Sequence, residues 1–366
     1  MVPYWGVYLK SLGYSSQDVG IIGAIILATR IIAPNFWGWL ADRTQKRLQI
    51  IRIGSFAACV CFAGVFVDQT FAWLVLAVST YTFFWHAVLP QFEVITLTYL
   101  AREHHRYGQI RLWGSIGFIV AVLALGWLFD IISIHYLPVF ILTFLLLIGL
   151  SSISLKPIAP LDHSGAARGF RQIITQPTML CFLLMSFLLQ LSHGPYYTFY
   201  SLYLIDNHGY SSTVTGLLWA LGVLAEVAIF IVMHRLLRRF SLRNLLLTVL
   251  ALTTVRWWII AAFAEHWMLL LFAQLLHAGS FGVAHAVSME MVRRYFGTAH
   301  QSQGQALYSS LSFGAGGALG ALLGGIFWDQ SAALTFYFCG LCALLAFFIA
   351  YWGIFPQQKV NESSDS

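Results

Sequence analysis

Long apolar runs separated by short polar connections make up most of the chain. A helix needs roughly 20 apolar residues to cross about 30 Å of hydrocarbon, and eleven runs reach or approach this length. They cover residues 17–41, 49–67, 71–99, 109–129, 134–154, 178–205, 212–236, 244–264, 267–291, 304–328 and 333–355. A shorter run, residues 1–9, resembles one end of a further membrane helix.

The composition indicates which class of protein has this pattern of apolar runs. Hydrophobic residues make up 59% of the 366 residues and charged residues only 9%, whereas soluble domains carry about 25% charged residues. A chain so poor in charge needs lipid as its solvent, where only helices and closed barrels satisfy the backbone. Barrel strands alternate in hydrophobicity, but the run at residues 140–150 does not. We therefore predict an all-α polytopic membrane protein.

Lys and Arg residues are concentrated in every second connection between the apolar runs. Seventeen of the 20 Lys and Arg residues lie in these alternate connections or the C-terminal tail: Arg43, Lys46, Arg47, Arg52, Arg102, Arg106, Arg111, Lys156, Arg168, Arg171, Arg235, Arg238, Arg239, Arg243, Arg293, Arg294 and Lys359. Because cytoplasmic loops are rich in Lys and Arg, we expect both termini of the intact protein to be cytoplasmic, in a multi-pass protein of the cell inner membrane. The net charge of +6 then reflects topology, and we expect no nucleic-acid partner.

The two halves of the chain repeat. Residues 13–16 (Gly-Tyr-Ser-Ser) recur at 209–212, and Gly108-Gln109 recurs as Gly304-Gln305, both with an offset of 196 (209 − 13 and 304 − 108). Such repeats are typical of transporters whose halves rock about a central site. We expect a helical bundle at residues 1–155, a cytoplasmic loop at 156–177, a second bundle at 178–355 and a cytoplasmic tail at 356–366.

The same register predicts that the first helix of the first half is mostly missing. The helix at 178–205 ends at the equivalent of Leu9, and its first two-thirds have no counterpart before Met1. We expect about 15 to 25 further residues before Met1 in the native protein. Either the start lies inside the true reading frame or the chain is a fragment.

The connection after the second helix carries a family motif. Residues 38–47 read Gly-Trp-Leu-Ala-Asp-Arg-Thr-Gln-Lys-Arg, which resembles the major facilitator superfamily signature of a Gly, three residues, Asp, Arg and further cations. The usual Gly two residues after the Arg is Gln45 here. The resemblance implies two six-helix bundles and a conformational gating role for Gly38, Asp42, Arg43 and Arg47.

Finer features are similar to the 3-phenylpropionic acid transporter family within that superfamily. They are the stretches 107–115 (YGQIRLWGS), 193–197 (HGPYY), 218–226 (LWALGVLAE), 255–257 (VRW) and 275–279 (LLHAG). The resemblance implies a proton-coupled importer with an aromatic acid as the named ligand, and we expect the protein to be a monomer. Residues 114–129 contain no Pro, and so lack the Gly-Pro pair of drug antiporters.

Four ionisable residues lie deep inside apolar runs: Arg30, Glu93, Glu226 and Arg256. Such residues are costly in a membrane and usually functional. From the helical rise of about 1.5 Å per residue, each half holds one acid and one Arg at similar depth. We expect Arg30 to pair with Glu93, and Glu226 with Arg256. Each pair could only neutralise itself, or it could carry a proton on the acid and a substrate anion on the Arg.

Histidines and aromatic residues on the presumed cavity helices complete the candidates. Histidine can relay protons near neutral pH, and aromatic rings can stack on an aromatic ligand, although both residue types also serve packing. The histidines are His86, His193 and His277, and the rings are Trp85, Tyr196, Tyr197 and Tyr200. No nucleophile with a base, metal cluster or cofactor motif is found in the sequence, so we expect no enzyme, no cofactor and no metal.

The leading function is proton-coupled uptake of a small organic carboxylate by alternating access. Its partners are then the substrate, protons and the lipid bilayer. Two alternatives stay open: a proton symporter of a neutral nucleoside or sugar, and a transport-inactive membrane sensor.

Overall fold

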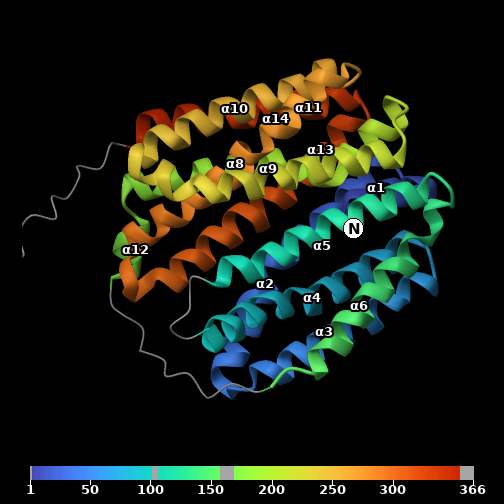
Figure 1. The fold of residues 1–366 in the computed structure, drawn as a ribbon, viewed down its shortest axis with the longest axis horizontal. Coiled ribbons are helices and arrows are strands. Elements are labelled where there is room, and N and C mark those ends of the chain that lie inside the picture. Colours follow the sequence, from blue (N-terminus) through green and yellow to red (C-terminus); the bar gives the residue numbers. More distant parts are fainter. Residues whose placement is uncertain (1, 101–105, 157–168, 355–366) are drawn as a thin grey trace, which may run out of the picture.

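The computed structural model describes residues 2–100, 106–156 and 169–354, and within these ranges it contains helices and no strand (Figure 1). The first group is α1 (Val2–Ser11), α2 (Ser16–Thr44), α3 (Arg47–Ala63), η1 (Gly64–Phe66), α4 (Phe71–Leu100), α5 (Tyr107–Phe129), η3 (Ile134–Tyr136) and α6 (Leu137–Ile153). After a short α7 (Phe170–Ile174), the second group is α8 (Pro177–Leu202), η4 (Tyr203–Asn207), α9 (Ser212–Arg239), α10 (Leu242–Phe263), α11 (Trp267–Leu275), η5 (Ala278–Val283), α12 (Ala284–Ser309), η6 (Ser310–Gly316), α13 (Gly317–Trp328) and α14 (Ala332–Gly353).

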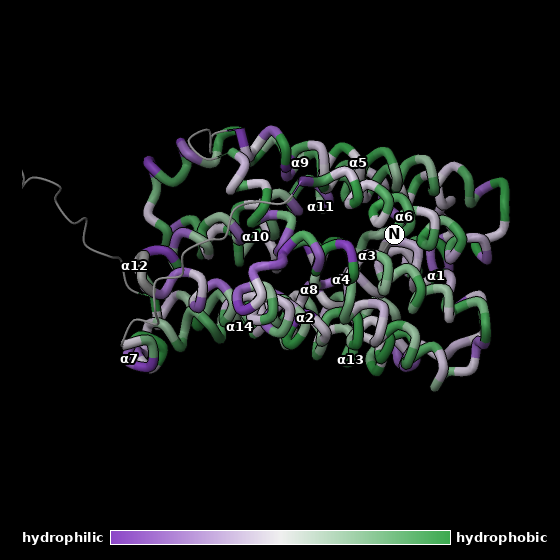
Figure 2. The backbone as a smooth tube through the Cα atoms, turned by 90° about the horizontal axis from the view of Figure 1, so that it is seen from below, coloured by the Kyte–Doolittle hydropathy of each residue, from purple (hydrophilic) through white to green (hydrophobic). Residues whose placement is uncertain are grey.

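Eleven helical segments in the described ranges are long and apolar enough to span a membrane. They coincide with the eleven apolar runs in the sequence, and hydrophobic residues follow the helices along their length (Figure 2). The predicted all-α membrane fold is therefore confirmed. The segments η4, η5 and η6 are π-helical turns inside three of these spans, which hydropathy does not predict.

The helices pack as two groups, which meet mainly along two crossings and also where α1 packs against α8. In the first group α2 and α3 pack against α4, and α6 packs against α3; in the second, α8 packs against α13 and α14, and α10 against α14. The groups meet where α5 packs against α9 and where α2 packs against α13. The space that matters for function lies between these two crossings.

The repeated Gly-Tyr-Ser-Ser sequence has a structural cause. Gly13 and Gly209 both have positive φ angles, 88° and 67°, which a glycine adopts without steric cost. The next-but-one residue then caps a helix: the Ser15 side chain accepts from the Asp18 backbone N–H, and the Ser211 side chain accepts from Val214. The repeat thus starts α2 and α9 in the same way.

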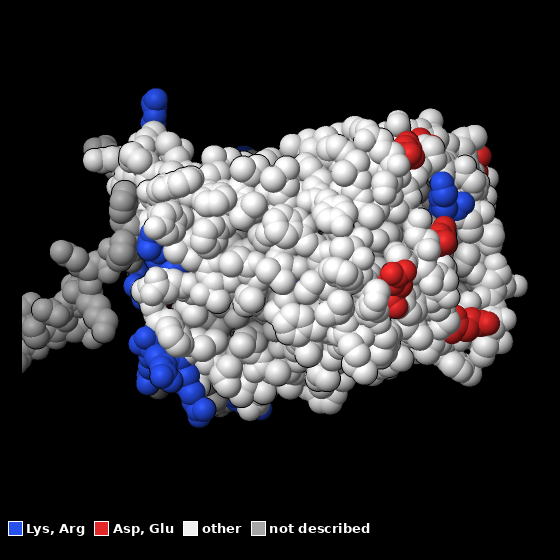
Figure 3. All heavy atoms as spheres, turned by 90° about the horizontal axis from the view of Figure 1, so that it is seen from above, with Lys and Arg blue, Asp and Glu red and all other residues white. Residues whose placement is uncertain are grey.

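Charge is segregated between the two ends of the molecule. On the face drawn in Figure 3, Lys and Arg predominate at one end and Asp and Glu at the other, with an uncharged middle. We call the end with Arg43, Arg52 and Arg239 the basic end, and the end with Asp130 and Asp329 the acidic end. Among the predicted cytoplasmic cations, Arg102, Arg168 and Lys359 lie outside the described residues, as do residues 356–366, the predicted tail.

The α5–α9 crossing is tight at the acidic end. A Cβ on Gly216 would lie 2.7 Å from the Val122 carbonyl oxygen, and one on Gly126 would lie 2.6 Å from the Ser212 carbonyl oxygen. Asp130, which follows α5, accepts hydrogen bonds from the backbone N–H groups of Ser212 (2.7 Å) and Thr213 (3.1 Å) at the start of α9. A carboxylate at a helix N-terminus is favourable because it meets unpaired N–H groups and the positive end of the helix dipole.

The α2–α13 crossing is closed in the same region. A Cβ on Gly325 would lie 2.7 Å from the Ser16 carbonyl oxygen, so the two backbones are almost in contact. Gln17 donates a hydrogen bond to Asp329 across the two groups (3.1 Å). Both crossings are therefore sealed at the acidic end.

Toward the basic end other helices cover α5 less than they do at the acidic end. Residues 109–114 of α5 are all exposed. Among the described residues, nothing lies within 4 Å of a Cβ built on Gly108, Gly114 or Gly117. The space between the two groups is thus closed at the acidic end and less covered toward the basic end.

Candidate substrate and proton site

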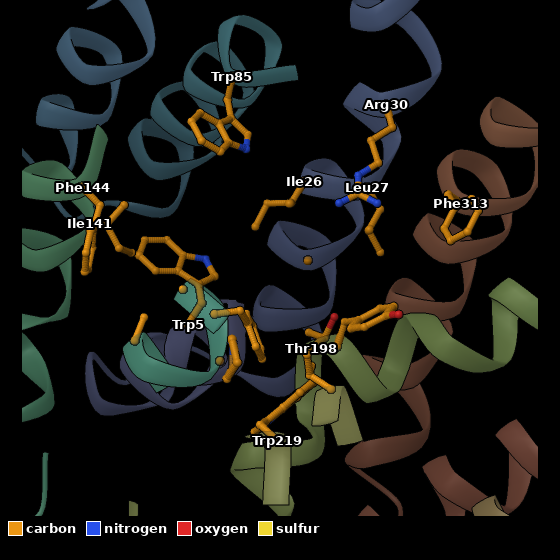
Figure 4. Close-up of a pocket in the computed structure, with 18 of the residues that line it drawn as sticks. Trp5, Ile26, Leu27, Arg30, Trp85, Ile141, Phe144, Thr198, Trp219 and Phe313 are labelled. Carbon is orange, nitrogen blue, oxygen red and sulfur yellow. The ribbon is translucent and has the colours of Figure 1, made fainter. Parts of the chain in front are cut away.

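A cavity of about 860 Å³ lies between the two groups of helices (Figure 4). Its lining is mostly apolar and aromatic, which is usual for sites of small organic ligands. It is lined by Pro3, Trp5, Gly6, Val19, Gly23, Ile26, Leu27, Arg30, Tyr81, Trp85, Gly117, Phe118, Ala121, Ile141, Phe144, Leu145, Ile148, Tyr197, Thr198, Trp219, Val223, Glu226, His277, Phe281 and Phe313. Three ionisable side chains other than tyrosine face it, and these are Arg30, Glu226 and His277.

The two groups contribute unequally to the apolar part of this cavity. In the first group α6 lines it through Ile141, Phe144, Leu145 and Ile148, whereas no lining residue comes from the equivalent α14 of the second group. In the second group the long α8 packs along α14 and covers it. We therefore locate the candidate site by its polar residues rather than by the whole volume.

Arg30 extends from α2 into the cavity (Figure 4). The predicted Arg30–Glu93 pair is wrong: the Glu93 carboxylate accepts from Arg111 (2.7 Å) and from the Tyr107 hydroxyl (3.2 Å), near the basic end of α5. The helical rise gave the depth of each residue but not the face of the helix on which it lies. No acidic side chain in the described part of the chain lies within 4 Å of the Arg30 guanidinium.

Glu226 pairs with His277 rather than with Arg256. Its Oε1 lies 2.7 Å from His277 Nε2, with 15% of the Glu226 side chain and 5% of the His277 side chain exposed. The predicted Glu226–Arg256 pair is wrong because α9 and α10, although consecutive, are separated by α11 and η5, which pack against both. His277 precedes η5 and thus stands on the helix between Glu226 and Arg256.

Arg256 is fully buried and held by neutral groups. It donates hydrogen bonds to the Ala273 carbonyl oxygen, to Ser280 Oγ (both 3.1 Å) and to Gln274 Oε1 (3.2 Å). Its guanidinium also lies over the rings of Tyr196 (4.5 Å) and Trp257 (4.2 Å). Cation–π contacts and three hydrogen bonds lower the cost of this buried charge.

The other histidine candidates do not line the cavity. His193 is buried, its Nδ1 lies 2.8 Å from the Leu189 carbonyl oxygen, and its ring contacts Trp257 edge-on. His86 Nδ1 lies 3.1 Å from Thr29 Oγ1. Of the three histidine candidates, the structure brings only His277 to the cavity wall.

The aromatic candidates divide in the same way. Trp85 and Tyr197 line the cavity on opposite groups of helices. Tyr196 and Tyr200 are fully buried beneath it, with ring centroids 4.8 Å apart. Trp85 and Tyr197 are thus placed to contact a ligand, and Tyr196 supports Arg256 instead.

The candidate gating residues lie at the basic end of α2 and α3. Asp42 forms an ion pair with Arg47, which also donates to Gln91 Oε1 of α4 (2.7 Å). Arg43 lies over the Trp39 ring at 5.6 Å, and nothing lies within 4 Å of a Cβ on Gly38 in the described residues. Their gating role stays a prediction.

Gln274 and Ser280 were missed by the sequence reasoning. Both hold Arg256 in place, and Gln274 also donates to the Leu218 carbonyl oxygen. A usable signal was present, because Gln274, His277 and Ser280 recur every three residues in an otherwise apolar run. That spacing places them on one face of a helix.

Known proteins agree with this architecture. The family model described as "MFS_1 like family" matches residues 1–338. The "Probable 3-phenylpropionic acid transporter" of Escherichia coli (strain K12) is 29% identical, over 95% of this chain and 92% of that protein. "Maltose permease" of Geobacillus stearothermophilus is 26% identical, over 94% and 88%. A crystal structure of a mutant of the nucleoside transporter NupG superposes with a TM-score of 0.86 at 14% identity, over 97% and 95%.

The family match covers most of the chain, and the similar proteins are transporters rather than enzymes. The resemblance found in the sequence motifs is therefore confirmed at the level of the family. The chain belongs to the MFS_1 like family and is a multi-pass secondary transporter of the major facilitator type.

Proposed function

We propose that this transporter takes up a small organic carboxylate together with protons, by alternating access across the cell inner membrane. The observation that carries the proposal is the cavity with Arg30 on one wall and the Glu226–His277 pair on the other. The first group of helices supplies an anion-binding residue. The second supplies a group that can carry a proton.

The position of Arg30 is an argument for an anionic substrate. A guanidinium in a membrane cavity without a carboxylate partner is costly, and a substrate carboxylate would lower that cost through two parallel hydrogen bonds. Trp85 and Tyr197 line the same cavity and offer ring faces to an aromatic substrate. The similarity to a probable 3-phenylpropionic acid transporter points to the same class of substrate.

The Glu226–His277 pair supports proton coupling. A carboxyl group hydrogen-bonded to an imidazole at the edge of a cavity can take up a proton from water and release it again. Arg256 carries a fixed charge behind the pair and is held by neutral groups. Glu226 is therefore the group to which we assign the transported proton.

The distribution of charge between the two ends is an argument for the orientation of the protein in the membrane. If Lys and Arg mark the cytoplasmic side, the basic end faces the cytoplasm, both termini of the intact protein are cytoplasmic, and the structure is the inward-facing conformation. The units that rock are then residues 1–155 and 178–355, joined by the loop 156–177, in a monomer.

A neutral nucleoside or sugar is the alternative substrate. It is favoured by the fold shared with a nucleoside transporter and by the similarity to a maltose permease. Arg30 favours the carboxylate over the neutral substrate, because a neutral substrate would leave the charge of Arg30 uncompensated. A transport-inactive sensor would bind a ligand in the same cavity without moving it.

Uptake into proteoliposomes tests the proposal. We expect radiolabelled 3-phenylpropionate and related aromatic carboxylates to accumulate when the inside is alkaline, and to stop accumulating when a protonophore collapses the gradient. Protonated weak acids also diffuse through lipid, so the gradient-driven rate is compared with protein-free vesicles. Counterflow without a gradient separates carrier activity from leak.

The outcomes discriminate between the functions. Gradient-driven uptake of a nucleoside or sugar, without competition by carboxylates, would replace the proposed substrate. Binding without counterflow of any of these solutes would favour the sensor. Carboxylate counterflow that no pH gradient accelerates would remove the proton from the mechanism.

Asp130→Asn is expected to loosen the acidic end. Partial burial disfavours the Asp130 carboxylate, but hydrogen bonds from Thr213 and Ser212 outweigh this and hold its pKa below the ordinary value. The contact is therefore complete above the ordinary Asp pKa of about 3.9 and is lost as the pH falls through the lowered pKa, so it persists at neutral pH. We expect the variant to weaken closure by about 1 kcal/mol, about fivefold in the conformational equilibrium.

A cysteine placed at Thr198 on the cavity wall measures this change. In a background without native cysteines, an impermeant thiol reagent added from the acidic side should label it about fivefold faster in Asp130→Asn. The matched control is Asp68→Asn, since Asp68 is at the same end but its hydrogen bonds, within the described ranges, stay in its own loop, to Thr70. Equal labelling in the two variants would show that Asp130 does not hold the crossing closed.

A further inference from the structure

His285 lies eight residues beyond His277 on the same span, toward the basic end. The ring of Phe281 stacks on both: its centroid is 5.6 Å from that of His277 at 21° and 6.3 Å from that of His285 at 10°. Eight residues of regular α-helix turn about 80° beyond two full turns. The π-helical turn η5 lies between the two histidines and reduces this angle, which brings both rings to one face.

Glu226 lies against the helix between these two histidines. A Cβ on Gly282 would be 3.7 Å from Glu226 Cγ, and Gly282 is three residues before His285, so the two positions are neighbours on the helix surface. The carboxylate bonds to His277 through Oε1. The Glu226 side chain therefore lies on the helix surface between His277 and the neighbourhood of His285.

The His285 ring packs between aromatic side chains, but one of its ring nitrogens is left unsatisfied by the described residues. Its Nδ1 is buried and has no hydrogen-bond partner in the described part of the chain. Phe313 of η6 meets its ring edge-on at 5.9 Å. The charged groups that act on it are Glu226 of α9 and Arg111 of α5, while Glu290 on its own helix is paired with Arg293 and Arg294.

We propose that His285 receives the transported proton from Glu226 and releases it to the cytoplasm. The Glu226 carboxyl gives its proton to an unprotonated ring nitrogen of His285, and the carboxylate then returns to His277. The imidazolium passes the proton to water at the basic end, and the like charge of Arg111 favours this release. This assignment rests on the proposed proton coupling and adds the route by which the proton leaves.

His285→Gln tests the route, because glutamine keeps a polar side chain but cannot carry a proton at neutral pH. We expect the rate of gradient-driven carboxylate uptake to fall at least tenfold, while counterflow, which needs no proton release, stays within twofold of the wild type. The matched control is His234→Gln, an exposed histidine at the basic end of α9. It should change neither rate.

Two results would overturn the assignment. Gradient-driven uptake within twofold of the wild type in His285→Gln would remove His285 from the proton route. Equal loss of uptake and counterflow, repeated in His285→Asn, would show a structural role instead. A wild-type protein without any response to the pH gradient is a separate outcome, because it rejects the proposed proton coupling itself.

Discussion

Replacing Arg30 by Gln is expected to weaken carboxylate binding about 100-fold. Hydrogen bonds to a charged group are worth about 1.5–3 kcal/mol each, and losing about 2.7 kcal/mol of a bidentate contact corresponds to that factor. Arg30→Lys should lose less, since the charge remains but the paired geometry does not. Quenching of tryptophan fluorescence can report binding because Trp5, Trp85 and Trp219 line the cavity.

The same variant should not harm folding. Arg30 has no carboxylate partner within the described residues, so its removal relieves a membrane charge instead of leaving one behind. We expect the melting temperature of the ligand-free Arg30→Gln protein to equal or exceed that of the wild type. A neutral amide analogue of the substrate should bind both proteins alike. Equal carboxylate binding by the variant and the wild type would reject Arg30 as the anion site.

Much of the fold could be predicted because lipid imposes strict rules on sequence. The spans follow from the length of apolar runs, and the segregation of Lys and Arg from Asp and Glu follows from the connections. The repeat at Gly13 and Gly209 indicated two similar halves, and in the structure it coincides with two helix starts, since a positive φ and a serine cap need those residues. Each of these signals is local, and local signals survive without a structure.

The side-chain partners could not be predicted because they depend on which helices touch. The helical rise per residue placed Glu226 and Arg256 at comparable depth in the membrane. In the structure, however, another span packs between their helices. The π-helical turn η5 also changes which residues share a face. Ordinary polar residues such as Gln274 gave no signal in isolation, although they satisfy the buried charge.

Glu226→Gln and Arg256→Gln are expected to fail in different ways. The amide of glutamine at 226 can still hydrogen-bond to His277 Nε2, so the protein should fold and keep counterflow but lose gradient-driven uptake. Glutamine at 256 leaves the acceptors at Ala273, Gln274 and Ser280 buried without their donor. Each such group costs about 1–3 kcal/mol, so this variant should lose several degrees of thermal stability and most of its expression.

The double variant decides whether the two charges are a pair. A direct ion pair would make Glu226→Gln restore the expression lost in Arg256→Gln, because neutrality returns. The structure places His277 on the intervening helix, so we expect no such recovery. We expect a coupling of about 1 kcal/mol or more between Glu226→Gln and His277→Gln in a double-mutant cycle of melting temperatures. Recovery in the Glu226→Gln/Arg256→Gln protein would instead show that the arginine is the partner of the carboxylate.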